Sequence, residues 1–316
     1  MTIKKNRAFV FIGDLLSVKE AGPLNVINGY YLKKADLSQI EIIKQSINSL
    51  GNQHQFCKRF ELRAIGGDNR GYTFEPLEPT EWNYWIIEHK HLQADTNFYI
   101  ALTLSEVDLH PLFEIVFKTK HSGPSKLYNL VAYNNFVIES SFEFGSKQIT
   151  RAEISNIREV YLLIQNLERV KEKFSYIYKA LIDFSYLRLI SNLTSFKVVG
   201  MFSIIESLIV HNPQKGDSSI TQQLMSKIAL LNNRFTEKID YRDYFKGPDT
   251  LTLQKVVEKL YSYRSDIAHG DFSDFSKDLQ VITDSKQSNS FLYSLVKKIV
   301  THSLKEPQLI HDLKLC

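Results

Sequence analysis

The pattern of the chain changes near residue 150, and this change limits its possible folds more than any other feature. Before it, short runs rich in β-branched and aromatic residues alternate with turn signals. After Gly145-Ser146-Lys147, apolar residues follow helical spacing over long segments. We therefore predict an α+β protein with two domains: a mainly antiparallel β domain with a helix at residues 1–150, and an all-α bundle at residues 151–316.

The first domain contains seven runs that we expect to be strands: 9–12, 27–32, 56–65, 82–87, 98–104, 112–118 and 130–138. One helix interrupts them; Asp36 or Ser38 can cap its start, and Gly51-Asn52 is expected to end it. The aromatic group Trp82, Tyr84 and Trp85 could hold a ligand, but in a β-rich domain such residues more often belong to the core.

The second domain is expected to be a bundle of four or five helices. Their ranges are 152–174 (with a continuation to 189), 196–210, 220–231, 252–269 and 291–304. Asp217, Ser218 or Ser219 can cap the third of these helices.

Composition describes a globular chain, with 43% hydrophobic and 23% charged residues. No apolar run reaches the roughly 18 residues that cross a bilayer, and Cys57 and Cys316 are too few for a disulfide framework. We therefore expect a cytoplasmic protein without a membrane segment. The net charge of +4 is compatible with an RNA partner but argues for one only weakly.

The helix 252–269 ends in the run Leu-Tyr-Ser-Tyr-Arg-Ser-Asp-Ile-Ala-His-Gly, residues 260–270. Arg264 and His269 are five residues apart and so lie roughly 140° apart on an ideal helix. Gly270 predicts a left-handed C-cap, after which His269 could turn back towards Arg264. A simpler interpretation is that both cations only cap a helix C-terminus, where positive charge is mildly favoured.

This run, together with the upstream helix Met-Phe-Ser-Ile-Ile-Glu-Ser-Leu-Ile-Val-His-Asn that carries Glu206, resembles the C-terminal part of HEPN domains, most closely the Apea-like branch. The resemblance covers roughly residues 152–304. It implies a HEPN helical bundle and a homodimer with the cleft at its two-fold interface. It also implies an RNA endonuclease that acts as a toxin-like effector in bacterial defence against phage.

Arg264 and His269 suit ribonuclease chemistry. Histidine can take the 2′-hydroxyl proton or protonate the leaving 5′-oxygen, and arginine can hold the phosphate with two parallel hydrogen bonds. One histidine cannot easily be both acid and base in one step, and the second motif of a homodimer resolves this difficulty. The expected products are a 2′,3′-cyclic phosphate and a 5′-hydroxyl.

Other residues are expected to support this pair. Ser265 or Asp266 could orient the arginine or the substrate, and Glu206 would be costly to bury unless it pairs with Arg264 or another cation. Lys255 and Lys259 share the motif helix and could contact RNA phosphates, although exposed lysines usually only solvate a helix.

No metal or cofactor is expected. His54 with Cys57, and His89 with His91, have metal-compatible spacing, but zinc sites usually show denser clusters. The stretch Gly66 to Gly71 lacks a phosphate-loop pattern and is better interpreted as a hairpin turn.

Two alternatives stay open. The bundle could be a non-catalytic HEPN module that binds RNA or nucleotide or only dimerises, although the chain retains both Arg264 and His269. Alternatively, residues 1–150 could carry the main activity, but they contain no catalytic constellation. We expect residues 1–150 to be a sensor or regulatory domain that receives a regulatory partner or a phage-derived trigger.

Overall fold

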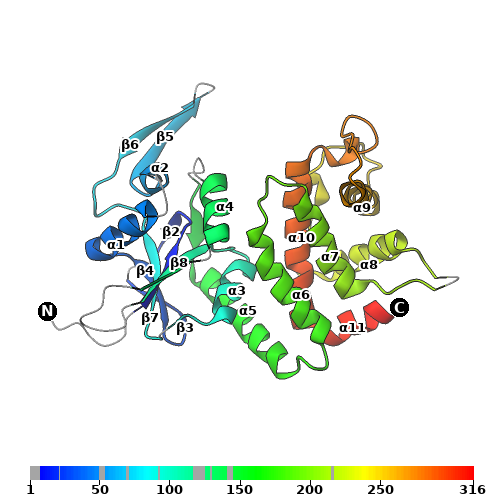
Figure 1. The fold of residues 1–316 in the computed structure, drawn as a ribbon, viewed down its shortest axis with the longest axis horizontal. Helices are drawn as coiled ribbons and strands as arrows, with labels where there is room; N and C mark the ends of the chain where they lie inside the picture. The colour runs from blue at the N-terminus through cyan, green and yellow to red at the C-terminus, as the bar shows by residue number, and fades with distance from the viewer. Residues whose placement is uncertain are drawn as a thin grey trace. The chain divides into compact units, whose positions relative to one another are not determined.

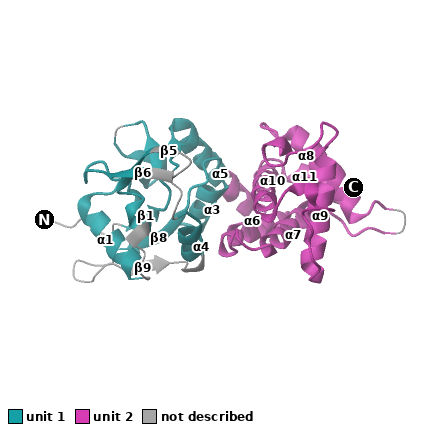
Figure 2. Ribbon diagram, turned by 90° about the horizontal axis from the view of Figure 1, so that it is seen from above, with its two compact units in different colours: residues 1–162 teal, residues 163–316 magenta. Residues whose placement is uncertain are grey.

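The computed structural model describes residues 8–20, 22–49, 54–68, 71–91, 93–116, 125–128, 130–140, 145–214 and 217–316. The chain divides into two compact units, residues 1–162 and 163–316, as coloured in Figure 2. We call them the N-terminal unit and the helical unit. The division falls inside helix α5 (Arg151–Arg169), whose first residue is the expected start of the second domain.

The N-terminal unit is built on a six-stranded antiparallel sheet with strand order β3-β4-β7-β1-β8-β9 (Figure 1). Its strands are β1 (Ala8–Ile12), β3 (Leu24–Ile27), β4 (Tyr30–Lys34), β7 (Trp85–His89), β8 (Pro111–Val116) and β9 (Ser125–Tyr128). Two further pairs lie beside it: the antiparallel hairpin β5 (Leu62–Asp68) and β6 (Gly71–Pro76), and the parallel pair β2 (Leu16–Val18) and β10 (Lys147–Ile149).

Helices cover both faces of this sheet. Phe9 and Phe11 of β1 pack into a core with α1 (Leu37–Asn48), α2 (His54–Lys58) and α4 (Leu130–Ser140). Val10 and Ile12 point the other way, into a core with α3 (Thr96–Leu104) and the first turns of α5. All five residues of β1 are buried because alternate strand residues face opposite sides and both sides are covered.

The predicted antiparallel sheet and the helix capped by Asp36 are confirmed, and Tyr84 and Trp85 are core residues as expected. Three expected strands are wrong. Residues 98–104 lie in α3, residues 130–138 lie in α4, and the first part of 56–65 lies in α2 and the turn that follows it. Short, fully apolar runs have no periodicity that separates a buried strand from a buried helix. Asp95, which accepts the backbone N–H of Asn97 at 3.0 Å, is the cap that starts α3.

The expected strand 27–32 is two strands joined by a tight turn. Gly29 has φ of 84°, a conformation that glycine adopts at no steric cost, and β3 and β4 pair on either side of Asn28-Gly29. The hairpin expected at Gly66 to Gly71 is confirmed as the antiparallel pair β5 and β6, whose strands extend into this stretch and pair as far as Asp68 and Gly71. Helix α1 ends at Asn48 with Ser49 as its C-cap, earlier than expected, and Gly51-Asn52 lie outside the described residues.

The helical unit contains the end of α5 and helices α6 (Ser175–Tyr186), α7 (Phe196–Ile209), α8 (Ile220–Arg234), α9 (Leu253–His269), α10 (Ser285–Lys305) and α11 (Pro307–Leu315). Helix α7 packs against α6, α8, α9, α10 and α11 and is therefore the central helix. Ser219 caps α8 and accepts the N–H of Gln222 at 3.3 Å. Helix α10 begins earlier than expected, and α11 was not expected. Among the described residues, no helix is both long enough and apolar enough to span a membrane.

Candidate functional site

Helix α9 carries the Arg-x4-His motif and has well-defined ends. Thr252 accepts the N–H of Lys255 at its start. At its end Gly270 has φ of 78°, and the N–H of Asp271 donates to the carbonyl of Asp266 at 2.8 Å. This is the predicted left-handed C-cap, here in its Schellman form. The cap places His269 at the last residue of the helix.

Arg264 faces helix α7, where Glu206 lies. Its Nη2 atom is 3.4 Å from Oε1 of Glu206, and its guanidinium lies 5.5 Å from the centre of the Tyr261 ring. The Tyr261 ring in turn packs edge-on against Phe202 of α7, at 5.4 Å between centroids. The arginine is thus held between a carboxylate and an aromatic face, while 26% of its side chain stays exposed.

The Arg264–Glu206 contact is an ion pair without the alignment of a hydrogen bond. Oε1 of Glu206 and Nε of Arg264 are buried and have no hydrogen-bond partner among the described residues. Burial raises the pKa of Glu206, and the positive charge of Arg264 offsets this only in part. The donors of Arg264 are therefore not consumed by Glu206, so an oxyanion can compete for the guanidinium.

His269 is exposed, and within the described residues it has no hydrogen bond or ion pair. Because α9 continues to His269, its Cα stays roughly 140° around the helix from that of Arg264. No described contact joins the two side chains. One copy of α9 presents the arginine towards α7 and the histidine at the helix end, and these groups do not form a site together by direct contact.

The other expected residues are spread over α9. Ser265 and Asp266 are half-buried, and Oδ2 of Asp266 accepts the hydroxyl of Ser273 at 3.4 Å. Exposed Lys255 pairs with Glu258 on its own helix at 2.9 Å, while Lys259 is half-buried.

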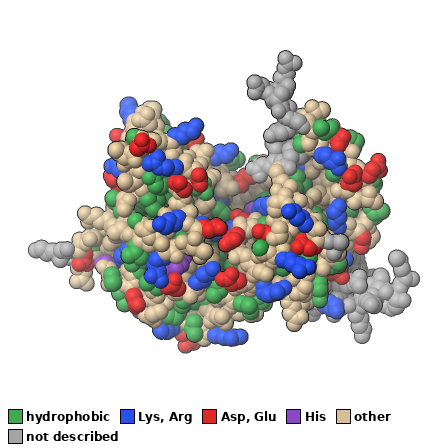
Figure 3. Space-filling model, turned by 180° about the vertical axis from the view of Figure 1, so that it is seen from behind, with side chains coloured by type: hydrophobic (Ala, Val, Ile, Leu, Met, Phe, Trp, Pro, Cys, Tyr) green, Lys and Arg blue, Asp and Glu red, His purple; other side chains and the backbone are tan. Residues whose placement is uncertain are grey.

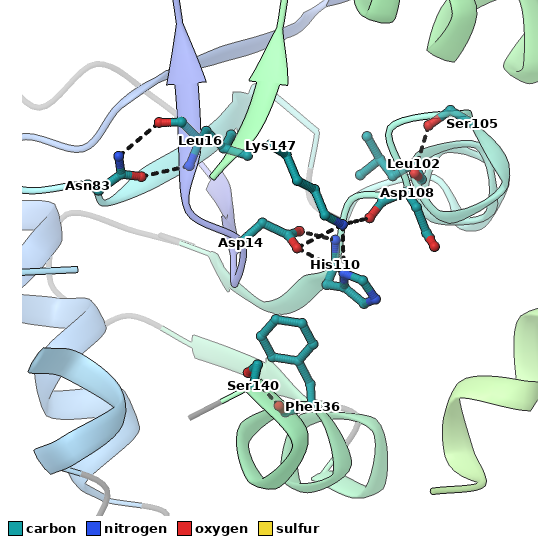
Figure 4. Close-up of polar contacts among 10 residues, drawn as sticks. All are labelled: Asp14, Leu16, Asn83, Leu102, Ser105, Asp108, His110, Phe136, Ser140 and Lys147. Carbon is teal, nitrogen blue, oxygen red and sulfur yellow. Dashed lines mark hydrogen bonds and ion pairs between the residues drawn. The ribbon is translucent and has the colours of Figure 1, made fainter. Parts of the chain in front are cut away.

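A second polar cluster lies in the N-terminal unit and was missed by sequence reasoning (Figure 4). Asp14, which follows β1, accepts the backbone N–H of His110 at 2.7 Å and lies 3.0 Å from Nδ1 of the same residue. Nζ of Lys147, at the start of β10, is 2.9 Å from the Asp14 carboxylate and also donates to the carbonyl of Asp108. Asp14 and His110 are 96 positions apart and Lys147 lies further along the chain, so only the fold brings the three residues together.

Burial alone would raise the pKa of Asp14, but His110 and Lys147 hold it well below its usual range. The Asp14 carboxylate therefore stays ionised at neutral pH. It joins the ends of β1, β8 and β10, and the cluster has a structural role that its burial and contacts explain.

His89 and His91, which were considered as metal ligands, instead contact a carboxylate and an aromatic ring. His89 is fully buried, and its Nε2 lies 3.0 Å from Oε1 of Glu114. The same carboxylate accepts the N–H of Ala94 and the hydroxyl of Tyr99. The rings of His89 and His91 both stack on Tyr30, at 5.1 and 5.3 Å.

Within the parts of the chain that the structure describes, no three His, Cys, Asp or Glu residues are grouped so that they could hold a metal. The side chain of His54 lies outside those parts.

Neither the surface charge nor comparison with known proteins indicates a function. On the face drawn in Figure 3, Lys and Arg side chains alternate with Asp and Glu, so that face carries mixed charge. No family model, curated protein or solved structure matches the chain.

Proposed function

We propose that this chain is a metal-independent RNA endonuclease of the HEPN type, with Arg264 and His269 as its catalytic pair. The observation that carries the proposal is the position of Arg264. Its guanidinium is half-buried between Glu206 and Tyr261, yet its charge is not consumed by aligned hydrogen bonds to the carboxylate. Such a fixed, partly exposed guanidinium is suited to bind a phosphate and stabilise the charge that develops on it.

The proton transfers in this proposal belong to His269. It is exposed at the end of α9 and is thus open to an RNA strand. One imidazole as base removes the 2′-hydroxyl proton, the 2′-oxygen attacks phosphorus, and the bond to the 5′-oxygen breaks. A second imidazole as acid protonates that oxygen. The products are a 2′,3′-cyclic phosphate and a 5′-hydroxyl, and DNA is resistant because it lacks the attacking hydroxyl.

A homodimer is part of the proposal. Arg264 and His269 make no direct contact within one chain, and one histidine cannot easily serve as both acid and base. Two copies of α9 that face each other would supply two arginines and two histidines to one cleft. We place the protein in the cytoplasm as an Apea-like defence effector, with the N-terminal unit as its sensor or regulatory part.

The test is cleavage of total RNA and tRNA in EDTA by the purified full-length protein, with the ends scored for cyclic phosphate. We expect Arg264→Ala and His269→Ala each to lower the cleavage rate at least about 100-fold, the usual range for loss of a transition-state charge stabiliser and of a general acid–base group respectively. Gln254→Ala, an exposed position at the start of α9, is the matched control and should leave the rate unchanged. Circular dichroism and thermal unfolding check that all three variants fold.

The competing function is a non-catalytic HEPN module that binds RNA. The observation that favours it is the same ion pair, since Glu206 already partners Arg264 within the chain. Equal RNA binding by the wild type and both variants, with no cleavage by any of them, would overturn the nuclease proposal and leave this module. Cleavage that survives both substitutions would show that the motif is not the active site.

A further inference from the structure

The N-terminal unit contains a pocket of about 520 Å³ that no residue of the proposed nuclease site lines. It is formed by the residue before β2, the end of β4, the segment that follows α2 with the first residues of β5, the connection between β6 and β7, and the residue before β10. Pockets for small molecules usually measure roughly 300–1,000 Å³. This one is therefore large enough for a mononucleotide.

Three of the four charged residues that line the pocket are cations. Lys34, Arg59 and Arg63 line it together with Glu81, and Arg63 pairs with Glu81 and with Glu75, which lies outside the lining. The Nζ atom of Lys34 has only the carbonyl of Thr80 near it, at 3.4 Å, and no acidic partner within the described residues. Lys34 therefore carries a charge that an anion in the pocket can neutralise.

The arginines are held in different ways. Arg59 is 3% exposed and is enclosed by the rings of Phe56, Phe60 and Phe136, with its guanidinium carbon 5.4 to 5.8 Å from their centroids. Its position is therefore fixed. Arg63 pairs with Glu75 at 3.3 Å and Glu81 at 3.0 Å, but about half of each side chain is exposed. Exposed pairs of this kind are weak, so the Arg63 guanidinium can turn to a stronger anion.

The rest of the lining is apolar or rigid. Leu15, Leu62 and Leu77 supply apolar surface. Asn83 is bound at both ends of its amide, since it accepts the N–H of Leu16 and donates to the carbonyl of Leu16, each at 2.8 Å. These two hydrogen bonds between the Asn83 side chain and β2 fix the wall of the pocket before any ligand binds. The pocket thus combines apolar surface with several polar and charged groups that could orient a ligand.

We propose that this pocket binds a phosphorylated small molecule of mononucleotide size. The phosphate lies among Lys34, Arg59 and Arg63, and the apolar part lies against the leucines. A phosphate has enough oxygens to accept hydrogen bonds from Lys34 and from the arginines, and arginine binds phosphate oxygens through two parallel bonds. The proposal stands independently of the nuclease activity, although it would give the proposed sensor unit a ligand.

The experiment is isothermal titration of the full-length protein with 5′-AMP and 5′-GMP, with adenosine and inorganic phosphate as partial ligands. We expect at least one nucleotide to bind with a dissociation constant below about 1 mM, and the nucleoside to bind at least tenfold more weakly, since the phosphate contacts are charge-assisted. Lys34→Ala and Arg63→Gln should each weaken nucleotide binding by roughly tenfold. Both residues are exposed, so neither change should impair folding, and thermal unfolding verifies this.

Lys33→Ala is the matched control. Lys33 is the neighbour of Lys34 on β4, it pairs with Glu88 and it does not line the pocket. Its substitution should leave nucleotide affinity unchanged. The proposal is overturned if neither nucleotide binds at up to about 5 mM, if adenosine binds as tightly as the nucleotides, or if the double variant Lys34→Ala/Arg63→Gln retains full affinity.

Discussion

At the scale of the residue, Asp14 is a buried carboxylate that its partners keep charged. It is 5% exposed, and burial by itself would favour its neutral form. A backbone N–H and a ring nitrogen of His110, together with the ammonium of Lys147, outweigh burial and hold the pKa of Asp14 below its usual range. Its charge therefore stabilises the folded state at neutral pH.

Asp14→Asn should lower the free energy of unfolding at pH 7 by about 2 kcal/mol, since it weakens hydrogen bonds to a charged group and leaves Lys147 without its partner. The difference from the wild type should be complete above the unfolded pKa of roughly 3.9 and shrink below it, because the unfolded carboxylate then binds a proton; it should vanish only when the pH falls through the lowered folded pKa. Urea unfolding at pH 7 and at pH 3 measures both effects.

Asp249→Asn is the control for this substitution. The Asp249 side chain is fully exposed, and its only described ion pair, with Arg242, is 3.8 Å long. Its loss should change the stability by less than about 0.5 kcal/mol. Equal effects of the two substitutions would contradict a stabilising role for the Asp14 charge.

The pKa of Glu206 shifts in the opposite direction from that of Asp14. Burial raises the pKa of Glu206, and the positive charge of Arg264 offsets this only in part. Between the ordinary glutamate pKa of roughly 4.3 and the raised folded value, the folded chain binds a proton that the unfolded chain has lost. Wild-type stability therefore falls as the pH rises through this window, and Glu206→Gln abolishes that fall. In urea unfolding, the free energy of unfolding of Glu206→Gln minus that of the wild type should be larger at pH 7 than at pH 4. A smaller difference at pH 7 would contradict the raised pKa of Glu206.

At the scale of the element, helix α9 depends on its C-cap. Gly270 has φ of 78°, and a Cβ added there would meet no atom within 4 Å, so a substitution strains only the backbone. Gly270→Ala should destabilise the protein by about 1 kcal/mol, the usual cost of a left-handed non-glycine residue. Gly145→Ala is the control because that glycine also has open space around its Cβ and does not have the left-handed conformation. Thermal unfolding compares the two, and equal stability of both variants would contradict the role of the cap.

Elements with local end signals could be predicted from sequence. Asp36 before α1, Ser219 before α8 and Gly270 after α9 each mark an end by a hydrogen bond or a backbone conformation that one residue type favours. Helix α3 could not be recognised by periodicity, because seven of its nine residues are buried and no polar face remains. The Asp95 cap was the missed signal for this helix.

Some parts of the candidate sites could likewise be predicted from sequence, and others could not. A cation beside Glu206 follows from a physical argument on sequence alone, since a carboxylate on an apolar helix needs one nearby, and the structure shows that this cation is Arg264. The Asp14–His110–Lys147 cluster and the cationic pocket could not be inferred, because their members come from distant segments that only the sheet order assembles. Tyr261 lies in the same run as Arg264, but the spacing alone did not predict that its ring would contact the guanidinium.

At the scale of the whole molecule, the helical unit leaves the proposed catalytic pair incomplete. Arg264 is directed to α7 and His269 to the exposed end of α9, so one chain offers a single histidine to an RNA strand. If acid and base are the two histidines of a homodimer, a dimer with one His269→Ala chain has no complete pair.

Wild-type and His269→Ala chains, mixed in equal amounts and allowed to exchange subunits, should cleave RNA at about one quarter of the wild-type rate, because random pairing leaves one quarter of the dimers with both histidines. Light scattering first establishes that the chains are dimers, and tagged chains confirm exchange. Gln254→Ala chains, mixed in the same ratio, should leave the full rate. A rate of one half would mean that each chain acts independently, and that a single His269 per site suffices for cleavage.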